Sequence, residues 1–162
     1  MVTSATRVAD LFEIRYGHSL ELNRLARTYA PSGANFVSRA GRNNGVVARV
    51  VVPPRTETGK PGELTVALSG NGVLSTFVQP EPFLTAYHVA ILTPHNETMS
   101  VAEKLWWARC IKANRYRYSY GRQANRTLRE LRLPDVPEYV SPSLIEQTVV
   151  QLAERLRVPQ SF

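Results

Sequence analysis

The sequence contains few cysteines, few lysines and no long apolar run, and each scarcity excludes a class of protein. A single cysteine in 162 residues, Cys110, excludes a disulfide framework and a zinc site built from cysteines. No apolar run approaches the roughly 20 residues needed to span a bilayer, and residues 1–10 lack the apolar core of a signal peptide. We therefore expect a soluble, cytoplasmic protein that folds without disulfides or metal.

The sequence also lacks a recognisable catalytic motif. It has no phosphate-binding P-loop and no complete dinucleotide-binding fingerprint, and its three histidines lie far apart. His88 stands in an apolar stretch, which favours a structural histidine in a strand. Cys110 stands among apolar residues, which favours a buried core position over a nucleophile. We expect no enzymatic activity, no cofactor and no metal.

What the sequence does have is arginine, concentrated in one stretch. The chain contains 17 arginines and 3 lysines and carries a net charge of +7, and residues 109–132 account for all of that excess. Arginine presents a planar fork of donors that fits phosphates and guanine edges. This stretch therefore predicts a surface that binds a polyanion, nucleic acid first, while a solvated basic face is the alternative. Its basic residues are Arg109, Lys112, Arg115, Arg117, Arg122, Arg126, Arg129 and Arg132.

Length and apolar patterning predict one α+β domain with a central mixed or antiparallel sheet and flanking helices. The sequence Ser-Gly-Asn-Gly at residues 69–72 separates two apolar runs and is typical of a hairpin. The turn at residues 40–45 contains Asn-Gly, which accommodates positive φ. The strands that we expect cover residues 35–39, 46–52, 64–68, 73–78 and 83–92.

Capping signals predict the helices. Ser19 precedes a short apolar pattern at residues 20–27, and Ser100 begins a capping box for a helix that ends near residue 114. A short helix is expected at residues 124–131, and a last one follows Ser141. In the helix after Ser100, the expected core positions are Leu105, Trp106, Ala108 and Ile111.

Residues 113–131 combine arginines, tyrosines and amides in a way that suits nucleic acid. Arginine contacts phosphates or guanine, whereas Gln123 and Asn125 are able to pair with adenine. The alternation of Tyr116, Tyr118 and Tyr120 also fits one face of a strand packed on the core, with arginines outward. The turns at residues 42–44 and 69–71 are further candidates for contacts, although turn chemistry alone explains their composition.

Several short motifs occur in an order that resembles a known family. They are Phe36-Val-Ser-Arg39, Asn43-Asn-Gly45, Leu68-Ser-Gly-Asn-Gly72, Ser75-Thr-Phe-Val-Gln79, Pro82-Phe83 and Tyr118-Ser-Tyr-Gly-Arg-Gln-Ala-Asn125. Together they resemble the target-recognition domain of the specificity (S) subunits of type I and BcgI-like restriction–modification systems. The similarity covers residues 8–139, and residues 142–147 resemble the entry to the helix that follows such domains.

The resemblance implies a DNA-reading module of α+β fold that leaves catalysis to methyltransferase and nuclease subunits. It differs from a standard S subunit, which has two recognition domains and two long spacer helices. Here we expect one target-recognition domain at residues 1–140 and a short, spacer-like C-terminal helix at 141–162. Such a chain would act as a half-subunit that forms a homodimer or pairs with a second half-subunit, as part of a larger defence complex, or as a stand-alone binder.

These inferences give a list of candidate residues and two rival functions. An apolar stripe at heptad-like spacing is expected to contact a partner helix or the core: Ile145, Val149, Leu152 and Leu156. One rival is a module that docks or regulates a methyltransferase without reading DNA; the other is a small nuclease with an unusual motif. The residues that we expect to contact double-stranded DNA are Arg39, Arg42, Asn43, Asn44, Asn71, Arg115, Arg117, Arg122, Gln123, Asn125 and Arg126.

Overall fold

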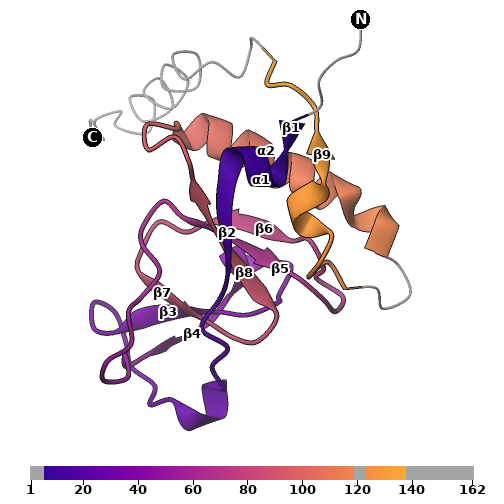
Figure 1. Cartoon of the computed structure of the whole chain (residues 1–162). Coiled ribbons are helices and arrows are strands. Elements are labelled where there is room, and N and C mark those ends of the chain that lie inside the picture. Colours follow the sequence, from indigo (N-terminus) through magenta and orange to yellow (C-terminus); the bar gives the residue numbers. More distant parts are fainter. Residues whose placement is uncertain (1–5, 119–122, 138–162) are drawn as a thin grey trace, which may run out of the picture.

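The computed structural model describes residues 6–118 and 123–137 (Figure 1). Within these ranges the strands are short and α2 is the one α-helix longer than about a turn, and this mixture confirms the predicted α+β class. In chain order the elements are β1 (Thr6–Arg7), α1 (Val8–Leu11), β2 (Phe12–Tyr16), the 3₁₀ helix η1 (Leu22–Arg24), β3 (Ala34–Val37), η2 (Asn43–Gly45), β4 (Val46–Val50), β5 (Leu64–Ala67), β6 (Thr76–Val78), β7 (Phe83–Thr85), β8 (Val89–Pro94), α2 (Val101–Ala113), η3 (Asn114–Tyr118), η4 (Leu128–Glu130) and β9 (Arg132–Leu133). The domain limits that we expect, 1–140 and 141–162, stay a prediction.

Two sheets and a small strand pair make up the β structure. The larger sheet has the order β2-β8-β5-β6 and is antiparallel throughout. The smaller sheet has the order β4-β3-β7, in which β3 pairs with β4 antiparallel and with β7 parallel. Strands β1 and β9 form the third pair. Figure 1 shows α2 at one end of the molecule and the smaller sheet at the other, with the larger sheet between them.

Helix α2 begins as its capping sequence predicts, but its buried face differs from the expected one. The Ser100 Oγ accepts a hydrogen bond from the Glu103 N–H at 3.1 Å. Ala108 and Ile111 are buried, whereas Leu105 is 52% exposed and Trp106 is only partly buried. Trp107 occupies the core instead, because adjacent helical residues point about 100° apart. Cys110 is buried as predicted, and its burial raises the pKa of the thiol.

The predicted strand at residues 83–92 is two strands that belong to different sheets. A turn at Tyr87 and His88 separates β7 from β8, and His88 has a φ of 57°. The break allows the chain to pass from the smaller sheet to the larger one. Phe83 and Val37 of the smaller sheet and Ile91 of the larger sheet share a core cluster. The prediction that His88 lies in a strand is therefore wrong, because His88 belongs to this turn. Its Nδ1 lies 2.9 Å from the Tyr16 hydroxyl.

Tertiary contacts also replace two of the predicted helices. Within residues 20–27 only Leu22–Arg24 are helical, as the 3₁₀ turn η1. Ser19 has a φ of 55° and does not cap a helix. The apolar residues of this segment pack beside the smaller sheet, so extended backbone buries them as well as a helix would. Residues 124–131 form a turn followed by η4. The predicted β5–β6 hairpin is confirmed, with a longer turn and a shorter second strand than expected.

A buried carboxylate fixes the loop before β5 to the larger sheet. Both oxygens of Glu63 accept hydrogen bonds from Arg15 at 2.9 Å. The Thr93 hydroxyl and the Lys60 N–H donate to the same carboxylate at 2.8 and 2.7 Å. Burial by itself raises the pKa of Glu63, but the hydrogen bonds from these three residues and the charge of Arg15 outweigh it, so the net pKa is lowered.

We expect this site to make the protein sensitive to acid. The pKa of Glu63 in the folded protein is lower than its ordinary value of 4.5. Glu63 therefore stabilises the fold fully above pH 4.5, and this contribution is lost as the pH falls through the folded-state pKa. Glu63→Gln should reduce the free energy of unfolding by about 2 kcal/mol at pH 7, because hydrogen bonds to a charged group are lost. Urea unfolding at pH 7, 5, 4 and 3 measures this free energy, which should fall less with decreasing pH in the variant than in the wild-type protein. If it falls equally in both proteins, Glu63 is not the source of the acid sensitivity.

Candidate nucleic-acid interface

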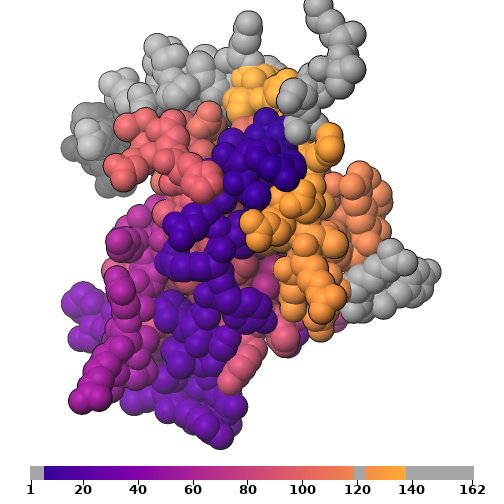
Figure 2. All heavy atoms as spheres, viewed as in Figure 1, coloured from indigo at the N-terminus to yellow at the C-terminus, as the bar shows by residue number. Residues whose placement is uncertain are grey.

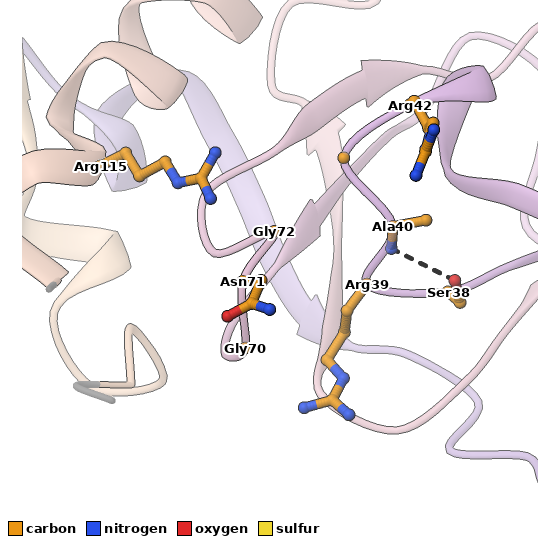
Figure 3. Close-up of a pocket in the computed structure, with 9 residues that line it drawn as sticks. Ser38, Arg39, Ala40, Arg42, Gly70, Asn71, Gly72 and Arg115 are labelled. Atoms are coloured by element: carbon orange, nitrogen blue, oxygen red, sulfur yellow. Dashed lines mark hydrogen bonds between the residues drawn. The ribbon is translucent and has the colours of Figure 1, made fainter. Parts of the chain in front are cut away.

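Three segments that are distant in sequence surround one open hollow of about 620 Å³. They are the β3–β4 loop, the β5–β6 loop and the start of η3. Figure 3 shows Arg115 on one side of the hollow and Arg42 on the other, with Asn71 between them. The structure thus brings four of the residues predicted to contact DNA to one place. The lining residues are Ser38, Arg39, Ala40, Gly41, Arg42, Gly70, Asn71, Gly72 and Arg115.

Backbone contact between the first two loops forms the floor of this hollow. A Cβ atom built on Gly72 would lie 2.0 Å from the Arg39 carbonyl oxygen and 3.3 Å from the Gly41 nitrogen. Position 72 therefore requires glycine for close approach. Gly70 requires it for conformation, because its φ is 79°. The two glycines of the hairpin turn thus hold the second loop directly against the first.

A pair of amide side chains, those of Asn44 and Gln79, holds the β3–β4 loop against the end of β6. Gln79 is fully buried at the end of β6, and its Nε2 donates to the Asn44 carbonyl and to the Thr65 hydroxyl, each at 2.9 Å. The Asn44 Nδ2 donates back to Gln79 Oε1 at 3.1 Å, and Asn44 has a φ of 56°. Asn43 is exposed and donates to the Val46 carbonyl at 2.8 Å. The Asn43 amide therefore bonds close to its own loop, whereas the Asn44 amide ties the loop to Val78 and Gln79 at the end of β6.

The charge around the hollow is uncompensated. Arg39 donates to the buried Ser69 hydroxyl at 2.8 Å, which holds its guanidinium at the tip of the second loop. In the described ranges, 6–118 and 123–137, neither Arg42 nor Arg115 forms an ion pair, and no acidic residue lines the hollow. Several arginines elsewhere do pair with carboxylates, namely Arg7, Arg15, Arg24, Arg49 and Arg129.

A second group of predicted residues lies beside the same hairpin turn. The Ala124 N–H donates to the Leu68 carbonyl at 2.8 Å, and Ala124 is fully buried. This contact anchors a segment on which Gln123, Asn125 and Arg126 are all exposed. The Asn125 amide donates weakly to Gln123 Oε1 at 3.3 Å. Arg122, the remaining predicted contact here, lies outside the described residues.

The tyrosines do not form one face of a strand. Residues 114–118 form the 3₁₀ helix η3, so Tyr118 is buried while Tyr116 is 70% exposed. The Tyr118 hydroxyl is 2.6 Å from the Thr127 hydroxyl, which links the two sides of the basic stretch. Arg117 lies 5.5 Å from the centre of the exposed Tyr116 ring and donates to its hydroxyl at 3.0 Å. Tyr120 lies outside the described residues.

The remaining expectations concern metals, membranes and the C-terminal stripe. Among residues 6–118 and 123–137, no group of three His, Cys, Asp or Glu side chains is placed to hold a metal ion. No helix within those ranges has the length and apolar character needed to cross a membrane. The stripe of Ile145, Val149, Leu152 and Leu156 lies outside the described residues.

Sequence reasoning selected Arg39, Arg42, Asn71 and Arg115 but did not identify what holds them together. Gln79 and Ser69 appear within the motifs quoted above, yet nothing in a single sequence distinguishes a bracing glutamine from a surface one. The Gly-Asn-Gly turn carried a signal for conformation. The turn sequence gave no signal for the contact between Gly72 and Arg39, because these positions are 33 residues apart in the chain.

Comparisons with known proteins give a consistent answer for the fold. No protein-family model and no curated protein matches the sequence. Among solved structures, the type I restriction–modification S subunit from M. genitalium matches with a TM-score of 0.61 at 12% identity, over 94% of this chain and 42% of that one. The HsdS subunit from Thermoanaerobacter tengcongensis matches with a TM-score of 0.62 at 15% identity, over 96% and 40%.

A third match comes from a study of the assembly and conformational transition of the type I system. It has a TM-score of 0.61 at 16% identity, over 93% of this chain and 40% of that one. The chain thus spans about two-fifths of the length of these structures. It has the fold found in that part of type I specificity subunits, which confirms at the level of the fold the resemblance to a target-recognition domain.

Proposed function

We propose that this chain is a sequence-specific, double-stranded DNA-binding specificity module of a restriction–modification or related phage-defence system. It has no catalytic activity of its own in this proposal, and methyltransferase and nuclease subunits are its partners. The fold supports the proposal, because the solved structures that share it are S subunits of type I systems.

One observation carries the proposal further than the fold does. Arg39, Arg42, Asn71 and Arg115 come from three separate segments and meet around one hollow, and no acidic side chain of the described residues lines it. A folded protein that gathers cations without counter-charges gains from binding an anion there. The exposed segment with Gln123, Asn125 and Arg126 is anchored at Leu68, just before the same hairpin turn, and offers amide groups suited to base edges.

The salt dependence of DNA binding tests the proposal directly. If four to six of the arginines without acidic partners meet phosphates, log K plotted against log salt should have a slope of about −3.5 to −5.5, at roughly −0.9 per contact. Fluorescence anisotropy with a labelled duplex between 50 and 300 mM salt measures this slope. A flat response would contradict electrostatic binding, and RNA bound as tightly as duplex DNA would contradict the recognition role.

The exposed Arg126 distinguishes base reading from phosphate contact in its segment. If Arg126 reads a base, Arg126→Ala should cost roughly 1–3 kcal/mol on the preferred duplex, selected from a random library, and almost nothing on a scrambled one. If it meets a phosphate, both duplexes should weaken equally and the salt slope should fall by about 1. We expect the first result, because the neighbouring amides suit base edges. Unchanged affinity on both duplexes would remove this segment from the interface.

A second candidate function is a docking module that binds a methyltransferase without reading DNA. The outer face of α2 favours it, because Val101 and Leu105 are 63% and 52% exposed one helical turn apart. Capture of a methyltransferase subunit by a chain that shows no salt-dependent duplex binding would favour docking over recognition.

A further inference from the structure

We infer that the hollow between the β3–β4 and β5–β6 loops is a site for a phosphate of the DNA backbone and does not read bases. The inference rests on the proposed function and assigns affinity and sequence discrimination to different residues. Arg39, Arg42 and Arg115 supply affinity that is independent of sequence, and discrimination between sequences comes from exposed segments outside the hollow.

The first argument is shape. Base edges lie recessed at the floor of a groove, so the element that reads them must project into the groove. Phosphates are the outermost groups of a duplex and project from it. An open hollow of about 620 Å³ is therefore better suited to receive a projecting phosphate than to reach a recessed base edge. Figure 2 shows one face of the molecule with all heavy atoms drawn as spheres.

The second argument is chemistry. Three guanidinium groups line the hollow, and each offers a fork of donors that matches two oxygens of a phosphate. Among the residues that the structure describes, the side chains that line the hollow include one amide, that of Asn71, and no carboxylate. Carboxylates accept from cytosine, and their absence from the lining leaves a donor-rich site suited to an acceptor-only group.

The third argument is that the site is formed before any ligand binds. The contact of Gly72 with the Arg39 carbonyl fixes the two loops against each other. The Arg39–Ser69 hydrogen bond also joins the two loops, and the Asn44–Gln79 pair fixes the first loop to the end of β6. Holding like charges together costs free energy in the unbound protein, and a bound phosphate offsets that cost without further ordering of the loops.

The experiment compares single charge removals on two duplexes. Arg42→Ala and Arg115→Ala should each weaken the preferred and the scrambled duplex by the same factor, about eightfold at 0.1 M salt, and reduce the salt slope by about 0.9. These two side chains make no bond in the described ranges that folding would lose. Arg27→Ala is the matched control, because it removes the same charge from an exposed position that does not line the hollow.

A second measurement identifies the phosphate itself. A methylphosphonate, which has no charge, is placed at each position of the preferred duplex in turn. At one or two positions it should weaken binding to the wild-type protein about eightfold and leave binding to the Arg42→Ala, Arg115→Ala double variant almost unchanged. Inorganic tripolyphosphate tests the other source of the same chemistry and should compete only at concentrations far above those of the duplex.

The outcomes separate this inference from the proposed function. If the wild-type protein binds duplex DNA and both arginine variants behave like Arg27→Ala, the phosphate site is wrong while the proposed function stands. Losses confined to the preferred duplex would assign base reading to the hollow and overturn the inference. Tripolyphosphate bound as tightly as the duplex would assign the hollow to a free phosphate compound and overturn it as well. If the wild-type protein binds no duplex, both proposals fail.

Discussion

Gly72→Ala should lower both the stability of the protein and its affinity for DNA. The new Cβ would lie 2.0 Å from the Arg39 carbonyl oxygen, which is backbone and unable to rotate away. The two loops must separate, at a cost of about 3 kcal/mol in the free energy of unfolding. Each arginine that then fails to reach its phosphate weakens DNA binding about eightfold at 0.1 M salt. Chemical denaturation and anisotropy measure the two effects.

Gly41→Ala is the matched control in the facing loop. Its Cβ would lie 3.3 Å from the Ser75 hydroxyl oxygen and 4.0 Å from the Gly72 Cα, so no backbone atom comes closer than ordinary van der Waals contact. We expect a loss of less than about 1 kcal/mol and DNA affinity close to that of the wild-type protein. If the two alanine variants behave alike, the close contact between the loops does not shape the site.

Gln79→Leu should be the second severe substitution, although Gln79 lies behind the hollow. The leucine removes the amide that donates to the Asn44 carbonyl and to the buried Thr65 hydroxyl. The Asn44 amide loses Gln79 as an acceptor and keeps the Val78 carbonyl at 3.2 Å. Buried polar groups without partners cost about 1–3 kcal/mol each, so we expect a loss of about 3 kcal/mol in the free energy of unfolding.

Asn44→Gly provides the comparison for that variant. Glycine tolerates the φ of 56° at this position and deletes only the side chain of the pair. We expect a loss of about 1 kcal/mol together with weaker DNA binding, because the Arg39–Arg42 loop is then held less firmly. A Gln79→Leu variant as stable as the wild-type protein would show that the amide pair does not brace this loop.

The sequence predicted the local features of the fold well. The Ser100 cap and the Ser-Gly-Asn-Gly turn were identified because each depends on residues within a few positions of one another. The segments at residues 20–27 and 83–92 were predicted wrongly for the opposite reason. Their apolar residues are buried by sheets that form elsewhere in the chain, and those contacts select a backbone different from the local preference.

For the candidate site, the sequence determined which groups are present, and the tertiary structure decided where they meet. Arginine-rich composition, the lack of catalytic motifs and the order of short motifs follow from the residues themselves. The hollow does not, because Arg42, Asn71 and Arg115 become neighbours only when the fold places a loop from each of the two sheets beside the start of η3. Gly72 and Gln79 acquire their roles from contacts more than 30 positions away in the chain. Chemical type is a property of each residue, whereas proximity across such separations exists only in the folded molecule.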